Sequence, residues 1–424
     1  MCTNGIKVWK WASTALLISV FVCLSLRATF AQAPQRDLDF FLSQGRSNSP
    51  LLKDLINQRK ALRIDSMIIN AGAGPQLSAT GAGLYAPIIQ GIGYDEVITN
   101  GQSLEAYLNL NYDLLKKKRL KNQLEGVKIV SDSLGYEEKM SLYDLERSIV
   151  DQYLVAYASQ EQLDFDKEVV TLLKQEEGIL KQLTRKNIYK QSEYLAFLVT
   201  LQQQQVLREQ SELQLQNDYA ALASSSGLID TSKIILKEPR LGYSQLLFKS
   251  DFFLQKFEFD SLRRSNLKQG IALNYKPRLG VYSNSGYSSS FMLQPYKNFG
   301  VSIGFSLTVP IYDGHQRSMQ YEKLAILGNT VSAYKNFFIT QRTQQLKFIQ
   351  QQISKTDALF EHIKEQIRLS RGLIDVDSKL LHTGDLRVAD YILAINNYMA
   401  AQNLLRQTTI NRLKLINQYN YWNR

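Results

Sequence analysis

Side chains that could carry out chemistry are few in this sequence, and their spacing does not suggest catalysis. The three histidines, His315, His362 and His382, are far apart and lack the spacing to acidic residues that metal ligands usually show. The sequence also contains no nucleophile elbow and no phosphate-binding loop. We therefore expect no enzyme activity, no catalytic residues, no cofactor and no metal site.

Two acidic residues are better candidates for a site. Glu193 and Asp390 are each followed by a tyrosine, and each lies shortly after a break in a long helical pattern. If copies of the chain brought these carboxylates together around a narrow opening, they would attract cations and raise one another's pKa. The alternative is a pair of solvated acids on helix surfaces. Arg387 would either pair with Asp390 or face the solvent.

Composition and the first residues place the chain among exported folded proteins. The 424 residues carry a net charge of +11 and are 44% hydrophobic, which excludes a disordered chain and a disulfide scaffold. Residues 1–31 resemble a secretory signal, with Lys7 and Lys10 before an apolar stretch and a small-residue site at Ala31. Both cysteines lie in this segment, so the mature chain needs neither a disulfide nor a thiol.

The elements that must position the acidic residues are long helices. Between Pro87 and Pro239, and again after Pro310, the chain has no proline and is rich in Leu, Gln, Lys, Glu and Ala. From Leu346 to Ile374 the apolar positions step by three and four residues over four heptads. A helix of about 50 residues would be about 75 Å long, which is more than a compact domain can bury. The pattern therefore predicts extended coiled coils.

Segments with the period of a strand precede the helical intervals. Residues 300–311 alternate strictly between apolar and small polar residues, which is typical of a strand that crosses an outer membrane. A similar alternation begins near residue 104. A sandwich strand packed on a core would have the same pattern. In the membrane interpretation, the lipid-facing residues of the last strand are Val301, Ile303, Phe305, Leu307 and Val309.

The sequence also contains an internal duplication. Pro75 aligns with Pro277 at an offset of 202, Glu193 aligns with Asp390 at an offset of 197, and a glycine between them aligns at 199. Each copy is expected to contain two strands, a long helix, a tip and a long return helix. Four strands cannot close a barrel, because the smallest closed barrels need about eight. Lipid does not tolerate an open sheet edge, so several chains must share one barrel.

Two motifs resemble the TolC-like outer membrane efflux protein family. The segment beginning at Gly384 is similar to the family pattern Gly-x5-Asp-hydrophobic-x2-Ala at the second helical tip. The resemblance covers about residues 45–424, which is nearly all of the mature chain. The family's turn motif after the last strand is present as Pro310, Ile311, Tyr312, Asp313 and Gly314.

The resemblance implies a mainly α-helical chain with a membrane β-barrel. Four strands per chain would form a shared 12-stranded barrel in a homotrimer, continued by a periplasmic coiled-coil tunnel. It implies the outer membrane channel of a tripartite efflux or type I secretion system. Such a passive exit duct would be coupled through a periplasmic adaptor, or membrane fusion protein, to an inner-membrane pump of RND, ABC or MFS type. The protein would lie in the cell outer membrane, in contact with its lipids, with the helical part in the periplasm.

The resemblance also suggests roles for residues at the two tips. Glu193, Asp390 and Arg387 would surround the periplasmic entrance, although Leu393 occupies the place of a second acid found in relatives. Asn187 stands where the second copy has Gly384, and asparagine is the non-glycine residue that best tolerates left-handed backbone. A tight turn is therefore expected at both tips. The expected adaptor-contact residues are Asn187, Gln191, Gly384 and Asp385.

Two further expectations concern the basic run and the competing function. Lys116–Lys118, with Arg119 and Lys121, lacks the aromatic pattern of a nucleic-acid site, so we expect a solvated helix face or attraction to anionic lipids. The alternative function is a non-conducting periplasmic scaffold or tether anchored in the outer membrane. Small polar residues on the lumen side favour a conduit, with Tyr107 as the one large exception.

The expected organisation follows from these patterns. It comprises a signal peptide at 1–31, a first repeat at 32–228, a connection at 229–274 and a second repeat at 275–424. Strands are expected at about 75–112 and 277–311, and helices at about 113–227 and 315–420.

Overall fold

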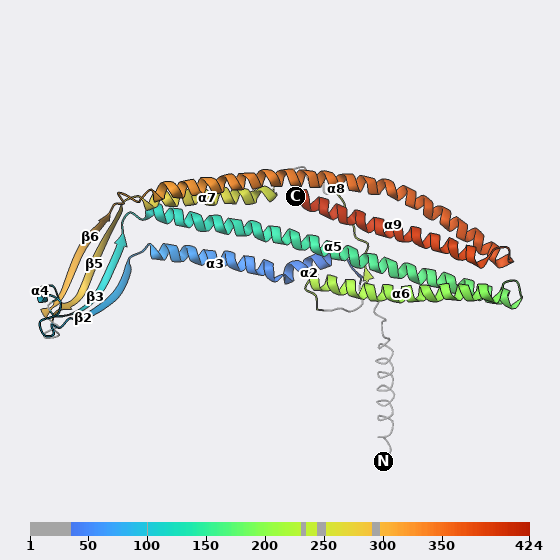
Figure 1. Ribbon diagram of the computed structural model, residues 1–424, viewed down its shortest axis with the longest axis horizontal. Helices are drawn as coiled ribbons and strands as arrows, with labels where there is room; N and C mark the ends of the chain where they lie inside the picture. Colours follow the sequence, from blue (N-terminus) through green and yellow to red (C-terminus); the bar gives the residue numbers. More distant parts are fainter. Residues whose placement is uncertain (1–34, 100, 230–234, 244–251, 291–296) are drawn as a thin grey trace, which may run out of the picture. The chain divides into compact units, whose positions relative to one another are not determined.

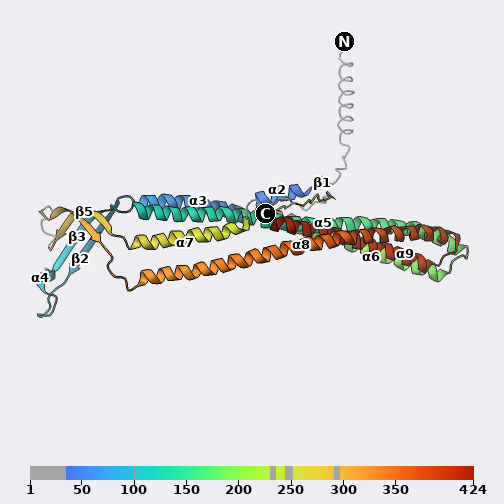
Figure 2. The same cartoon turned by 90° about the horizontal axis from the view of Figure 1, so that it is seen from above.

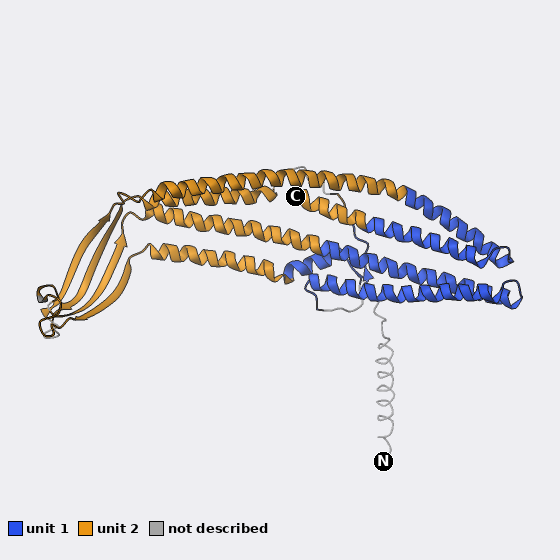
Figure 3. Ribbon diagram, in the orientation of Figure 1, with its two compact units in different colours: residues 1–47, 149–241, 362–410 blue, residues 48–148, 242–361, 411–424 orange. Residues whose placement is uncertain are grey.

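The structure is a computed structural model that describes residues 35–99, 101–229, 235–243, 252–290 and 297–424. The expected signal peptide, residues 1–31, lies outside the described residues. The chain divides into two compact units, which Figure 3 distinguishes by colour. Unit 1 comprises residues 1–47, 149–241 and 362–410, and unit 2 comprises residues 48–148, 242–361 and 411–424.

Unit 2 contains an antiparallel sheet of four strands. Their spatial order is β2 (Gln76–Tyr85), β3 (Gln102–Asp113), β5 (Arg278–Ser289) and β6 (Phe299–Thr308). Within the described chain β2 and β6 each have one neighbour, so two edges of the sheet have unpaired backbone groups. All ten residues of β2 are exposed, and Ile303 and Phe305 of β6 are 78% and 77% exposed. The described residues of the single chain therefore cover neither edge of this sheet and leave its apolar face exposed.

Helices of unit 2 adjoin the sheet in the sequence (Figures 1 and 2). They are α3 (Pro50–Gly72), α7 (Gln255–Asn274), the first part of α5 (Lys117–Arg185) and the first part of α8 (Gln316–Thr383). Arg59 of α3 pairs with Glu138 of α5 at 2.9 Å. Asn122 of α5 and Asn266 of α7 each donate a side-chain hydrogen bond to the other's backbone carbonyl, at 3.0 and 2.9 Å.

The sequence interpretation did not place helices α3 and α7. Helix α7 falls within residues 229–274, which were expected to form a connection, and helix α3 precedes the first strand. Helices α3 and α7 have 23 and 20 residues, so both are long enough to show a helical period. A local signal for α3 was present, because Ser49 caps the helix by accepting a hydrogen bond from Leu52 N, and Pro50 occupies its first turn.

The predicted duplication is confirmed by the element lengths. Helices α5 and α8 have 69 and 68 residues, and the return helices α6 (Gln191–Ser225) and α9 (Val388–Trp422) have 35 residues each. The return helices are thus about half as long as the helices before them. Each copy has the order strand, strand, long helix, return helix, which is the predicted unit.

Unit 1 is helical apart from one short pair of strands. Strand β1 (Gln35–Arg36) pairs in parallel with β4 (Ile235–Leu236). Helix α2 (Leu38–Asn48) buries Phe41 against the rings of Tyr153 and Tyr219. The Tyr153 hydroxyl donates a hydrogen bond to Lys237 O at 2.6 Å, which fixes the short strands against α5. Among the described residues no helix is both long enough and apolar enough to cross a membrane.

Candidate functional site

Two helical tips in unit 1 have the same backbone design. After α5, Ile188 N donates to Leu183 O at 3.0 Å and Asn187 has a φ of 60°. After α8, Asp385 N donates to Leu380 O at 3.0 Å and Gly384 has a φ of 87°. Both turns are Schellman motifs, in which a left-handed residue satisfies the last helical carbonyls. The predicted tight turn with Asn187 in left-handed geometry is therefore confirmed.

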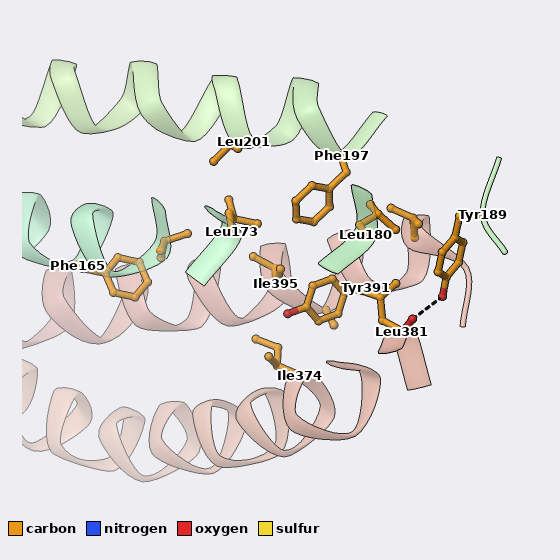
Figure 4. Packing of buried hydrophobic residues seen from close by; sticks show 13 residues of the cluster. Phe165, Leu173, Leu180, Tyr189, Phe197, Leu201, Ile374, Leu381, Tyr391 and Ile395 are labelled. Carbon is orange, nitrogen blue, oxygen red and sulfur yellow. Dashed lines mark hydrogen bonds between the residues drawn. The ribbon is translucent and has the colours of Figure 1, made fainter. Parts of the chain in front are cut away.

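The two tips of one chain contact each other. A Cβ atom on Gly384 would lie 2.5 Å from Ile188 Cγ2, so the first tip rests directly on the glycine of the second. Tyr189, which is 6% exposed, places its hydroxyl 2.9 Å from Leu381 O and 2.8 Å from Leu386 O (Figure 4). Sequence reasoning missed Tyr189, although an aromatic residue directly after the tip turn was a usable signal.

The acidic candidates occupy equivalent positions in the first turns of their helices. Glu193 is the third residue of α6, and its Oε2 accepts a hydrogen bond from Lys190 N at 3.0 Å. Asp390 is the third residue of α9 and binds Arg387 through both carboxylate oxygens, at 2.8 and 2.9 Å. The structure thus contains the pair of Arg387 and Asp390, while the Arg387 side chain remains 79% exposed.

The tips carry balanced charge. Lys186, Lys190 and Arg387 stand beside Glu193, Asp385 and Asp390 in the two tip segments. A single chain therefore does not present a strongly acidic surface there. The tip residues Asn187, Gln191 and Asp385 are exposed, whereas Gly384 is half-buried under Ile188.

A buried polar network lies behind the tips. The Glu176 side chain on α5 is 7% exposed, accepts a hydrogen bond from Ser378 Oγ at 2.9 Å and lies 3.0 Å from His382 Nε2. Burial, together with the nearby Glu176 carboxylate, raises the pKa of Tyr391. Burial also raises the pKa of Asp377, as does the charge of Asp390. This network joins α5 to α8 and α9, and no local motif predicts it because Glu176 and His382 are 206 residues apart.

Around this network the helices share one apolar cluster (Figure 4). Its members come from α5, α6, α8 and α9 and from the first tip, so both hairpins of unit 1 pack on a common core. The labelled members are Phe165, Leu173, Leu180, Tyr189, Phe197, Leu201, Ile374, Leu381, Tyr391 and Ile395.

The turn motif after the last strand supplies hydrogen-bond acceptors for the backbone N–H groups at the start of α8. Asp313 accepts hydrogen bonds from His315 N at 3.0 Å and from Arg317 N at 2.8 Å. The Arg317 N–H and then the Tyr275 hydroxyl hold the pKa of Asp313 below its usual range. Gly314 has a φ of 63°, which explains the glycine of the motif. In the first copy Asp113 accepts from Leu115 N at 2.9 Å, so the aspartate keeps this role without the neighbouring proline and glycine.

The remaining sequence candidates are exposed. Ile311 and Tyr312 follow Pro310 in the turn, and both side chains are exposed. Within the described residues no cluster of three or more His, Cys, Asp or Glu side chains is arranged to hold a metal ion. The residues expected to face lipid are all exposed: Val301, Ile303, Phe305 and Leu307 lie in β6, and Val309 directly follows it, because the strand ends at Thr308 and not at residue 311.

Comparison with solved structures identifies the fold. A membrane protein from Pseudomonas aeruginosa superposes with a TM-score of 0.74 at 15% sequence identity, over 92% of this chain and 91% of that one. The outer membrane protein VceC from Vibrio cholerae gives 0.72 at 13%, over 91% and 95%. The Campylobacter jejuni CmeC outer membrane channel gives 0.71 at 12%, over 91% and 85%. No protein-family profile and no curated protein matches the sequence.

These likenesses extend over nine-tenths of the chain and concern its fold. The chain therefore has the fold of these membrane proteins, with a small antiparallel sheet and long helices, and the predicted fold class is confirmed at the level of the single chain.

Proposed function

We propose that this protein is an outer membrane channel of the TolC-like type, which acts as a passive exit duct for an efflux or secretion system. The observation that carries the proposal is the four-stranded sheet, because one of its faces is apolar and exposed and both of its edges are unpaired in the described chain. The shared fold with solved outer membrane channels supports the same assignment.

The sheet supports an oligomer in the membrane. Unpaired backbone groups in hydrocarbon cost several kcal/mol each, so β2 and β6 need partners from other copies of the chain. Three copies would supply a closed 12-stranded barrel, with β6 residues such as Ile303 and Phe305 toward lipid and the small polar residues toward the lumen. We place the sheet in the outer membrane and the helices in the periplasm.

The tips support coupling to a partner. Asn187, Gln191 and Asp385 are exposed at the ends of two helical hairpins, where an adaptor would meet them. In this proposal a periplasmic membrane fusion protein contacts these residues, and an inner-membrane pump supplies the energy. The cargo passes through the trimer without chemical change.

The proposed gate is formed by the first turns of α6 and α9. Glu193 and Asp390 would narrow the periplasmic entrance, with Arg387 holding Asp390 in place. Replacing both acids with alanine removes the cap of α6 and the ion pair of α9, so the entrance should widen. The measurement is the single-channel current of the wild-type protein and of the Glu193→Ala, Asp390→Ala variant in a planar lipid bilayer.

We expect a small current from the wild type and a larger current from the double variant. Glu209→Ala is the matched control, because it removes an exposed acid of the same helix away from the tip. An unchanged current in a folded double variant would show that Glu193 and Asp390 do not form the gate. Efficient insertion without current from either protein would favour a tether, and a stable monomer in detergent would contradict the shared barrel.

A further inference from the structure

One buried carboxylate of unit 1 lacks a permanent countercharge. The Glu176 side chain on α5 is buried, and its Oε1 accepts a hydrogen bond from Ser378 Oγ at 2.9 Å. Among the described residues no lysine or arginine lies within ion-pair distance of it, and its partner is His382, whose Nε2 lies 3.0 Å from Glu176 Oε2. A buried carboxylate is costly unless a cation balances it. Here the balance depends on the protonation of one imidazole.

The pair of Glu176 and His382 joins the two hairpins of unit 1 close to their tips. Glu176 belongs to the first hairpin, α5 and α6, whereas Ser378 and His382 belong to α8 of the second. His382 lies in the last turn of α8, directly before the second tip. The end of a helix carries partial negative charge, so a proton on His382 is favoured by the helix end as well as by Glu176. A protonated His382 therefore strengthens a contact between the hairpins.

The strength of this contact should change within the ordinary range of pH. Histidine is the side chain that gains or loses a proton between about pH 5 and pH 8. A neutral imidazole donates from Nε2 in only one of its two tautomers, whereas the charged form always donates. Hydrogen bonds that involve charged groups are roughly twice as strong as neutral ones. The link between Glu176 and His382 should therefore be strongest at the acidic end of this range.

Other titratable groups of the second hairpin lie near the pair. Tyr391 of α9 stays neutral in this range, because burial and then the Glu176 charge raise its pKa. Asp390 of α9 is held by Arg387. Asp377 of α8 is buried, and burial followed by the charge of Asp390 raises its pKa, so its titration has to be separated from that of His382.

The groups around the tips and on the first hairpin are neutral or bound to neighbours. Burial raises the pKa of Tyr189, and the hydrogen bond to Glu177 raises the pKa of Tyr194. Asp385 accepts a hydrogen bond from Thr383 Oγ1 at 2.6 Å. Lys379, which precedes His382 on α8, is exposed to solvent.

The small number of histidines makes the pair easy to isolate. The sequence contains three, and His362 of α8 is exposed, while His315 contacts the ring of Tyr312. Within the described ranges, neither of these two imidazoles pairs with a carboxylate, so His382 alone combines a titrating ring with a buried acid.

We propose that His382 and Glu176 form a proton-responsive latch, which holds the two hairpins together more tightly as the pH falls. The inference rests on the proposed function, in which the tips of these hairpins narrow the periplasmic entrance. A more acidic periplasm would then favour the closed duct. Each copy of the chain in an oligomer would contribute one such latch.

The test is the open probability of single channels in a planar bilayer at about pH 5.5 and about pH 8, with the same salt on both sides. In the wild type the ratio of open to closed channels should be at least about five-fold higher at the upper pH. His382→Gln keeps a hydrogen-bond donor but cannot gain the charge, so this dependence should be lost. His362→Gln is the matched control on the same helix and should keep it.

Two results would overturn the latch in channels that conduct. One is a pH dependence in His382→Gln equal to that of the wild type. The other is a dependence that persists in His382→Gln and disappears in Asp377→Asn, because the proton would then bind Asp377.

A second readout does not depend on conduction. The difference in melting temperature between the wild type and His382→Gln should be largest at about pH 5.5 and should shrink toward about pH 8. Glu176→Gln keeps an acceptor for Ser378, and in its background His382→Gln should give no such pH dependence. A pH-dependent difference without any current would retain the latch and overturn the duct. Current without a pH-dependent difference in either measurement would overturn the latch and retain the duct.

Discussion

Replacing Tyr189 with phenylalanine should weaken the contact between the two tips of each chain. The hydroxyl of this buried residue lies 2.9 Å from Leu381 O and 2.8 Å from Leu386 O, and these are carbonyls of the second tip. Phenylalanine keeps the ring in the apolar cluster, so the change removes only the hydrogen bonding. Leaving a buried acceptor without its donor costs about 1–3 kcal/mol.

This free energy would be lost from the closed arrangement of the tips. Because each 1.4 kcal/mol is a factor of ten in an equilibrium constant, we expect the ratio of open to closed channels to rise at least about five-fold, and about 100-fold at the upper end of this range. The assay is the open probability of single channels in a planar bilayer. The control is Tyr194→Phe, because the Tyr194 hydroxyl bonds Glu177 Oε1 at 2.5 Å within the first hairpin and does not reach the second.

Two results would refute this reasoning. A folded Tyr189→Phe protein with the open probability of the wild type would show that the contact between the tips does not resist opening. An equal increase in Tyr194→Phe would show that any loosening of unit 1 has the same effect. Circular dichroism should report the helical content of both variants as unchanged, since neither hydroxyl belongs to a helical backbone ladder.

Further predictions concern the turns. Gly384→Ala should lower the melting temperature, because left-handed backbone costs an alanine about 1–2 kcal/mol and the new Cβ atom would lie 2.5 Å from Ile188. Asn187→Gly should leave the melting temperature nearly unchanged, because glycine adopts the same left-handed backbone without strain. Asp313→Asn should melt at a lower temperature than the wild type at pH 7. The pKa of Asp313 is lowered in the folded state, so the charged carboxylate stabilises the fold at pH values above its ordinary pKa of about 4. This stabilisation is lost as the pH falls below that value, and the difference in melting temperature between the two proteins should then disappear. A constant gap from pH 7 to pH 3 would contradict the role of the carboxylate charge.

Local patterns predicted those features that depend on neighbouring residues. The alternation of β6, the heptads of α8 and the turn residues Asn187 and Gly384 each follow from a short stretch of sequence, and the structure contains all of them. The duplication was visible because its two copies kept their order and spacing.

Contacts across the fold could not be predicted in the same way. Tyr189 meets Leu386 across 197 residues, and Glu176 meets His382 across 206, so no period or motif connects either pair.

The contact between the tips also shows how the two copies of the repeat have diverged. The offset of 197 that relates Glu193 to Asp390 also relates Tyr189 to Leu386, so equivalent positions have become the donor and the acceptor of one hydrogen bond. The first tip supplies the hydroxyl and the second supplies only backbone carbonyls, because a leucine side chain has no donor. The stability of the contact between the two tips therefore depends on Tyr189, a residue of the first copy. The bidentate ion pair of Arg387 and Asp390, in contrast, lies within the second copy. Substitutions at equivalent positions of the two tips should accordingly have unequal effects on channel opening, with the larger effect at Tyr189 than at Leu386.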